Sequence, residues 1–304
     1  MARRLIVLVA VLTLGGAGAS PGAREALEWK RGAPLPVPRS EVAATTLGGE
    51  LVVIGGFLAD GRSSARVDAY SPAGDRWRRL PSLPAAVNHA MAASDGKRLY
   101  VVGGYGAPTR AFMLSHGRWR RLPDLPEPRA AAGAAIVGRT LYVIGGVAQG
   151  GLARVALAFD RVRRRWSRIP GPKPREHLGV AALGGRVYAV AGREAGMNFD
   201  TFQSFVPARR RWLSLSRVPE TRGGTDVASV GSVIVSAGSE SPVGTSAAVY
   251  RYDVVTRHWT RLPDLPTARH GLGVVALAGR VYVVAGGPTP GLSVSGANEF
   301  LRLG

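Results

Sequence analysis

The 304-residue sequence contains no cysteine. This absence excludes disulfide bonds, thiol nucleophiles, thiolate metal sites and lipid attachment through a cysteine. Acidic residues are also scarce, since Asp and Glu together number 20 against 40 Lys and Arg, and nearly all the cations are arginine. The resulting net charge of +20 favours acidic partners, although genome composition alone can also produce arginine enrichment.

The apolar run at the N-terminus is too short to span a bilayer, which takes about 18 residues. The run from Leu5 to Leu14 follows Arg3 and Arg4 and precedes Ala17-Gly18-Ala19. This order is typical of a secretory signal peptide. We therefore predict that residues 1–19 are a signal peptide cleaved after Ala19 and that the mature protein is secreted or periplasmic. An uncleaved membrane anchor is the alternative.

Long helical patterns are missing as well, whereas 41 glycines and 21 prolines indicate many turns, so we expect an all-β fold. An apolar strand followed by Gly-Gly, or by a degenerate form of it, recurs at intervals of 42 to 48 residues. The glycines that mark it are Gly55, Gly103, Gly145, Gly192, Gly238 and Gly286. The six tryptophans have nearly the same period: Trp29, Trp77, Trp119, Trp166, Trp212 and Trp259.

Each of the last five tryptophans is preceded, seven positions earlier, by another aromatic residue, and we expect each pair to face across a β-hairpin. These residues are Tyr70, Phe112, Phe159, Phe205 and Tyr252. A proline-rich segment such as RLPDLP then ends the outer strand. One unit, for example, has strands at 131–137, 139–145, 153–160 and 165–169. Such a unit cannot cover both its faces alone, whereas six units arranged radially can, which predicts a β-propeller.

This set of motifs resembles the Kelch repeat, in which Gly-Gly follows an inner strand and Tyr or Phe, Trp and LPxLPxxR come after it. The resemblance covers residues 27–303 and implies a six-bladed β-propeller of four-stranded antiparallel blades, of the bacterial secreted kind. Blades four and five are interpreted as having lost the second glycine, to Arg193 and Ser239. The last unit has Phe300 but no tryptophan. We therefore predict that the N-terminal strand at 27–31 closes the ring, with Trp29 stacked near Phe300.

Five units begin the innermost strand with an arginine, on the face where the longer loops are expected. These residues are Arg39, Arg129, Arg175, Arg222 and Arg269, and the second unit has Asn88 and His89 instead. One hypothesis is a ring of guanidinium groups at the channel mouth that binds carboxylate or phosphate in bidentate fashion. The other is that each arginine is structural and donates to main-chain carbonyls of the next blade.

Acidic residues expected on the same face are few: Glu41, Asp60, Glu176, Glu194 and Glu240. Glu176, beside His177, and Glu194 are the candidates for acid–base catalysis, because nearby arginines would keep them ionised. His177 and His270 join the arginines, Asn88 and His89 as candidate ligand-binding residues. The three histidines lie 14, 15 and 16 residues before their glycines and so do not share one register. We therefore expect no metal site and no cofactor, and the HExxH and EF-hand patterns are missing.

Two functions stay open at this stage, and the sequence does not decide whether the protein is an enzyme. The first is an exported binding protein that recognises an anionic small molecule, a glycan or an acidic peptide. The second follows from similarity to six-bladed bacterial Kelch enzymes that mutarotate sialic acid, and is a carbohydrate epimerase with Glu194 and Arg222 as its candidate pair.

Arginine clusters such as RWRRL lie beside the outer strands, where they would keep strand edges from pairing with other chains or contact an anionic envelope surface. Nucleic acid is not an expected partner, because no nucleic-acid-reading motif is present. We expect a monomer.

Overall fold

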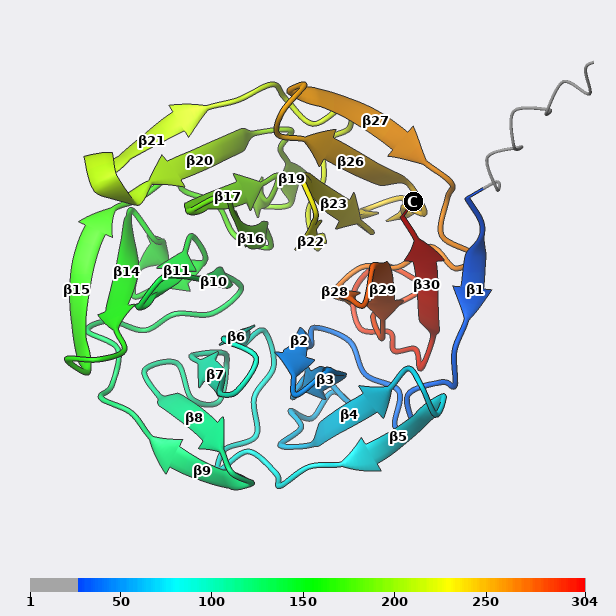
Figure 1. Ribbon diagram of the computed structural model, residues 1–304, viewed down its shortest axis with the longest axis horizontal. Helices are drawn as coiled ribbons and strands as arrows, with labels where there is room; N and C mark the ends of the chain where they lie inside the picture. The colour runs from blue at the N-terminus through cyan, green and yellow to red at the C-terminus, as the bar shows by residue number, and fades with distance from the viewer. Residues whose placement is uncertain (1–26, 304) are drawn as a thin grey trace, which may run out of the picture.

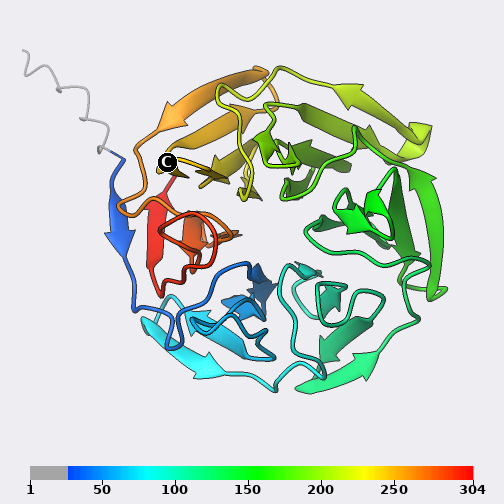
Figure 2. The same cartoon turned by 180° about the vertical axis from the view of Figure 1, so that it is seen from behind.

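The computed structural model describes residues 27–303, which form a ring of six blades around a central channel (Figure 1). Figure 2 shows the same ring from its other side. The predicted signal peptide, residues 1–19, lies outside the described residues. Across 27–303, no helix combines the length and the apolar character needed to cross a membrane. The predicted all-β, six-bladed propeller is confirmed.

Each blade is a four-stranded antiparallel sheet. Blade 1 contains β2 (Ala43–Leu47), β3 (Glu50–Ile54), β4 (Val67–Ser71) and β5 (Arg76–Arg79). Blade 2 contains β6 (Met91–Ser94), β7 (Leu99–Val102), β8 (Ala111–Ser115) and β9 (Arg118–Arg121). Blade 3 contains β10 (Gly133–Val137), β11 (Thr140–Ile144), β14 (Val155–Asp160) and β15 (Arg165–Pro170).

Blades 4 and 5 repeat this order from the channel to the rim. Blade 4 contains β16 (Gly179–Leu183), β17 (Arg186–Val190), β20 (Phe202–Val206) and β21 (Arg211–Ser214), with a 3-10 turn at Pro207–Arg209. Blade 5 contains β22 (Asp226–Val230), β23 (Val233–Ala237), β26 (Val249–Asp253) and β27 (His258–Leu262). The loops after the second strand in blades 3, 4 and 5 carry small hairpins: β12 (Val147–Ala148) with β13 (Gly151–Leu152), β18 (Arg193–Glu194) with β19 (Met197–Asn198), and β24 (Glu240–Ser241) with β25 (Gly244–Thr245).

Blade 6 is assembled from both ends of the chain. It contains β28 (Gly273–Leu277), β29 (Arg280–Val284) and β30 (Asn298–Arg302), and β1 (Trp29–Arg31) is its outermost strand. The predicted closure by the N-terminal strand is therefore confirmed. The predicted stack of Trp29 on Phe300 is wrong, because Trp29 lies opposite Leu301 and neighbouring residues of a strand point to opposite faces. Phe300 packs on Tyr282 instead, with ring centroids 5.3 Å apart.

Every tryptophan joins two blades. Each indole Nε1 donates to a main-chain carbonyl oxygen of the segment that leaves the neighbouring blade, at 2.8 to 3.0 Å. Four of the five predicted aromatic pairs are in contact, with centroids 4.9 to 5.3 Å apart. The pair of Phe112 and Trp119 is wrong: His116 and Gly117 alone form the turn of that hairpin, which places Leu114 opposite Trp119.

The repeat glycines also join neighbouring blades. In blade 1 the second glycine, Gly56, donates its N–H to the carbonyl of Val87 at the entry to blade 2, at 2.8 Å. In blade 4 the equivalent donor is Gly192, so the pair is Ala191-Gly192, and its first residue is an alanine with φ of 55°. The interpretation that blade four lost its second glycine to Arg193 is therefore wrong. Blade five does carry Ser239 as its second residue.

The core lies between the blades rather than inside one globule. One cluster, for example, packs Val52 and Ile54 of β3 against Leu99 and Val101 of β7, with all four side chains nearly or fully buried. Each blade therefore depends on its neighbours to bury its apolar faces, as expected for a repeat architecture. This arrangement holds the six innermost strands in register around the channel.

Candidate functional site

The walls of the central channel are built mainly from small residues. Its cavity of about 360 Å³ is lined by the innermost strands β2, β6, β10, β16, β22 and β28. These strands carry mainly alanine, valine and other small residues, and Asp226 is the one charged residue within their bounds. The chemistry of the channel is therefore concentrated at its ends.

A ring of main-chain hydrogen bonds surrounds one end of the channel. One residue from each blade, two positions before the innermost strand, has a left-handed φ between 49° and 69°. The six residues are Glu41, His89, Ala131, His177, Gly224 and Gly271. The N–H of each of the last five donates to the carbonyl of the residue before it in the ring, at 2.8 to 3.1 Å, and the N–H of Val42 donates to Gly271 at 3.4 Å. We call these residues the mouth ring.

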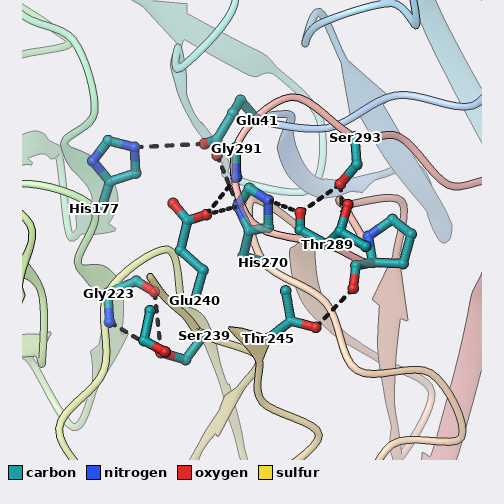
Figure 3. A network of polar contacts seen from close by, with 12 residues as sticks. Glu41, His177, Gly223, Ser239, Glu240, Thr245, His270, Thr289, Gly291 and Ser293 are labelled. Atoms are coloured by element: carbon teal, nitrogen blue, oxygen red, sulfur yellow. Dashed lines mark hydrogen bonds and ion pairs between the residues drawn. The ribbon is translucent and has the colours of Figure 1, made fainter. Parts of the chain in front are cut away.

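Polar and charged side chains gather around the mouth ring. Three come from the ring itself, two from the position before a ring residue, and three from the residue that directly follows the Gly-Gly position after the second strand of a blade. They are Glu41, His89, His177, Glu176, His270, Tyr105, Arg193 and Glu240. We call this group the mouth cluster, and Figure 3 shows part of it.

Glu41 lies at the centre of the mouth cluster (Figure 3). Its Oε2 atom is 3.2 Å from Nε2 of His89 and 3.8 Å from Nε2 of His177. Its Oε1 atom is 3.3 Å from Nδ1 of His270, and Nε2 of His270 is 3.1 Å from the carbonyl of Thr289. One carboxylate thus contacts three imidazoles, each from a different blade.

Arg193 connects the other two carboxylates. Its Nη1 atom lies 2.5 Å from Glu240 Oε1, and its Nε atom lies 3.4 Å from Glu176 Oε1. Glu176 in turn lies 3.3 Å from Nδ1 of His177, while Glu240 lies 3.4 Å from Nδ1 of His270. The mouth cluster is therefore one continuous network across blades 1, 2, 4, 5 and 6.

The network shifts the protonation equilibria of its members. Burial opposes ionisation of Glu41, but the three imidazoles around it hold its pKa well below the usual range. Burial lowers the pKa of His89, whereas at His270 the Glu41 and Glu240 carboxylates outweigh burial and raise the pKa. The contact with His177 lowers the pKa of Glu176. Clusters of acidic and basic side chains with shifted pKa values are typical of functional sites.

The five arginines do not lie at the mouth surface. Arg39, Arg129, Arg175, Arg222 and Arg269 have exposed fractions of 0%. Arg39, for example, donates from Nη1 to the carbonyls of Gly55 and Arg66, both at 2.9 Å, and from Nη2 to Asp68 at 2.5 Å. These acceptors belong to the arginine's own blade, not to the next blade as the structural hypothesis expected. The burial lowers the pKa of Arg175 to about 10, which leaves it charged at neutral pH.

This placement favours a structural role for the arginines over a shared anion site, because a ligand at the mouth does not reach fully buried guanidinium groups. Val87 takes the equivalent position in blade 2. Asn88 is buried beside the mouth and accepts at Oδ1 from Nδ1 of His89 at 2.5 Å. Glu194 is exposed on the β18 hairpin, outside the mouth cluster.

Sequence reasoning did not select four members of the mouth cluster: Glu41, Tyr105, Arg193 and Glu240. The signal for Glu41 was its spacing, since it follows Arg39 by two positions as His177 follows Arg175. The statement that the histidines share no register is wrong for two of them, because His89 and His177 occupy equivalent positions of the mouth ring. The residue of blade 4 that is equivalent to the first glycine of other blades is Ala191, not Gly192. His177 therefore precedes it by 14 residues, as His89 precedes Gly103.

The fold and the repeated glycine and tryptophan contacts define a Kelch-type propeller. A family model described as the KLHDC2/KLHL20/DRC7 Kelch-repeats domain matches residues 110–287, and a Kelch motif model matches residues 38–84. The chain belongs to the Kelch-repeat family.

Similarity to curated proteins is in agreement with this family. The Kelch-like protein terF of Aspergillus terreus is 31% identical over 290 residues, a match that covers 85% of this chain and 63% of that protein. Beta-scruin of Limulus polyphemus is 31% identical over 77 residues, covering 25% of this chain and 8% of that protein. Kelch domain-containing protein 8B of Rattus norvegicus is 36% identical over 66 residues, covering 22% of this chain and 19% of that protein. The chain thus spans less than two thirds of the length of these relatives.

Proposed function

We propose that this protein is an exported binding protein that receives an anionic ligand, with an acidic sugar as the class that fits best, at the mouth cluster. The observation that carries the proposal is the mouth cluster itself, which concentrates charged and hydrogen-bonding side chains at one end of the channel. Concave sites in which a few polar groups converge are the usual places where proteins bind small ligands.

Three features support an acidic sugar. Arg193 supplies a permanent positive charge, for which a ligand carboxylate would compete with Glu240 and Glu176. The carboxylates and imidazoles beside it suit sugar hydroxyls, which both donate and accept hydrogen bonds. Tyr105 is 43% exposed and lies next to His89, with ring centroids 5.3 Å apart, so its ring offers a surface on which a sugar can stack. The net charge of +20 would attract any anion to the molecule.

A thermal-shift screen tests this proposal. Glucuronic, galacturonic and N-acetylneuraminic acids are compared with glucose and galactose, and at least one acidic sugar should raise the melting temperature more than its neutral counterpart. Isothermal titration then measures the affinity. Equal, negligible shifts for all sugars would contradict the proposal.

Proton NMR of anomer exchange in the same samples separates binding from catalysis. Binding without faster exchange supports the binding protein. Exchange accelerated by the protein would favour a sialic-acid mutarotase-like epimerase, the alternative that the resemblance implied, and would replace the first proposal.

A further inference from the structure

Two histidines of the mouth ring direct their Nε2 atoms at each other. Nδ1 of His89 lies 2.5 Å from Asn88 Oδ1, and Nδ1 of His177 lies 3.3 Å from Glu176 Oε1. Asn88 Oδ1 is an acceptor, so neutral His89 carries its proton on Nδ1 and presents a lone pair at Nε2. Nδ1 of His177 makes no hydrogen bond, although a proton there would face the Glu176 carboxylate. The two Nε2 atoms are 3.0 Å apart, so a proton or a metal ion must lie between them.

Glu41 adds a third acceptor to the same point. Its Oε2 atom lies 3.2 Å from Nε2 of His89 and 3.8 Å from Nε2 of His177. Two lone pairs and a carboxylate oxygen repel one another unless a cation lies between them. The three side chains are only 8 to 12% exposed, so water screens this repulsion poorly.

The separations suit a small tetrahedral metal ion. Ligand atoms bound to zinc at about 2.0–2.1 Å lie about 3.3 Å apart at the corners of a tetrahedron. The three observed separations, 3.0, 3.2 and 3.8 Å, bracket that value. Two imidazoles and a carboxylate are also the ligand types that first-row divalent transition metals accept, in contrast to the all-oxygen sites of magnesium and calcium.

The surroundings hold the three ligands in place. Nδ1 of His89 hydrogen-bonds to an amide oxygen, the arrangement that commonly orients metal-binding histidines. Nδ1 of His177 lies 3.3 Å from the Glu176 carboxylate but makes no hydrogen bond with it. The backbones of Glu41, His89 and His177 are fixed by the hydrogen-bonded mouth ring. The second oxygen of Glu41 lies against His270 at 3.3 Å.

A second group, Glu41 with Glu240 and His270, also brings three ligand atoms together, but it is less suited to a metal ion. Both oxygens of Glu240 already accept from other donors, Oε1 from Arg193 and Oε2 from the N–H of Gly291 at 3.1 Å. A metal ion there would have to displace these donors.

We propose that Glu41, His89 and His177 bind one divalent transition-metal ion with three protein ligands, leaving a coordination position for water or another ligand. The proposal replaces the expectation from the sequence that no metal binds, which depended on the supposed difference in histidine register. It does not depend on the sugar ligand.

Metal titration of the full chain, prepared without a histidine tag and treated with a chelator, tests this site. We expect one Zn²⁺ per chain by isothermal titration, a higher melting temperature with zinc, and a visible Co²⁺ spectrum of the tetrahedral type. Ca²⁺ and Mg²⁺ should not compete. The replacements Glu41→Gln, His89→Asn and His177→Asn should each weaken zinc binding by more than about 100-fold, and Glu176→Gln by about 10- to 100-fold.

His116→Gln and His258→Gln are the matched controls, because both histidines are exposed and outside the mouth cluster. They should leave the affinity unchanged. Asparagine tolerates a left-handed φ, so the ring variants should keep their fold, which circular dichroism checks. A parent protein that binds neither Zn²⁺ nor Co²⁺ would overturn the proposal and show that protons alone separate the three acceptors. Binding that survives in His89→Asn and His177→Asn would also overturn it.

Discussion

At the scale of single residues, two kinds of buried charge serve different ends. The arginine of each blade, where present, donates to carbonyls and carboxylates of its own blade and so holds the loop and strands of that blade together. Arg269, for example, lies 2.8 Å from Glu299, and both side chains are at most 1% exposed. Most groups of the mouth cluster, in contrast, keep some exposure, and they contact one another across blades; His270, at 2%, is buried.

Breaking the Arg269–Glu299 pair should destabilise the protein strongly. Arg269→Met leaves the Glu299 carboxylate buried without its partner, and a loss of about 3–5 kcal/mol is typical of that change. Chemical denaturation measures it. Arg163→Met, at a side chain that is 74% exposed, is the control and should change stability by less than about 0.5 kcal/mol. The double replacement Arg269→Met with Glu299→Gln should recover part of the loss. An unchanged unfolding free energy for Arg269→Met would contradict the structural role.

Asp226 should make stability depend on pH. Burial in the channel wall raises the pKa of its carboxyl to about 7, and no other charged residue lies within the bounds of the six innermost strands. The folded protein therefore holds this proton more tightly than the unfolded chain, so the stabilisation is complete below the ordinary carboxyl pKa and is lost as pH rises toward 7.

The variant Asp226→Asn, which retains an oxygen for the N–H of Val274, tests this pH dependence. It should melt higher than the parent at pH 8, and the difference should shrink toward pH 4. Asp253→Asn gives the opposite sign, because main-chain N–H groups of Thr256 and Val255 lower the pKa of Asp253. Its contribution is present above the ordinary carboxyl pKa and is lost as pH falls. A parallel pH profile for parent and Asp226→Asn would contradict the assignment.

At the scale of elements, the segment just before the innermost strand of each blade determines which side chains lie at the channel mouth. Each of the six segments places one residue with a left-handed φ in the mouth ring, but the side chain of that residue differs from blade to blade. Gly271 and Gly224 leave room that Glu41 and His270 occupy. The main chains of the six blades are alike at the mouth ring, so the differences between their side chains produce the site.

Gly271→Ala should disturb the mouth cluster more than Gly224→Ala. A Cβ at Gly271 would lie 2.5 Å from Glu41 Oε1 and 2.6 Å from its Cδ, whereas at Gly224 the nearest atom is His270 Cβ at 3.2 Å. Both positions have left-handed φ, so both variants share the backbone cost of about 1–2 kcal/mol. Thermal melts and zinc titration of the two variants compare them. Equal zinc affinity in both would contradict the position of Glu41.

The sequence predicted the elements well and the contacts between them less well. The period of glycine and tryptophan, with the proline-rich exits, predicted six four-stranded blades and closure by the N-terminal strand. It did not predict that Ala191 takes the left-handed position usually held by glycine, because alanine rarely does so. That one-residue difference changed the register of His177. A two-residue turn likewise changed the partner of Trp119.

The candidate site was predicted only in part for a related physical reason. Arginine at a strand entry has the same spacing whether it faces a ligand or its own blade, and only the three-dimensional packing distinguishes the two. Glu41, His89 and His177 lie far apart in the chain, and their convergence depends on ring closure. His177 and His89 were selected as binding residues, but their contact with Glu41 could not be predicted without the mouth ring.

At the scale of the whole molecule, stability depends on closing the ring. The strand β1 pairs with β30 along Trp29, Lys30 and Arg31, and Trp29 donates to the carbonyl of Pro263 at 2.8 Å. A chain that begins at Gly32 should lose several kcal/mol, since removal of a buried tryptophan alone costs about 3–5 kcal/mol. A chain that begins at Leu27 is the control and retains β1. Equal melting temperatures for the two chains would show that β1 does not stabilise the ring.

The central claim is that ligands bind at the mouth cluster and not at the buried arginines, and affinity for an acidic sugar in two variants tests it most directly. Isothermal titration compares the parent with Arg193→Gln and Arg222→Met, both checked for folding. Arg193→Gln should lose about 1.5–3 kcal/mol of binding, typical of a hydrogen bond to a charged group, together with the preference for acidic over neutral sugars. Folded Arg222→Met should bind like the parent. Parent-like binding by Arg193→Gln, with binding lost in folded Arg222→Met, would contradict the account.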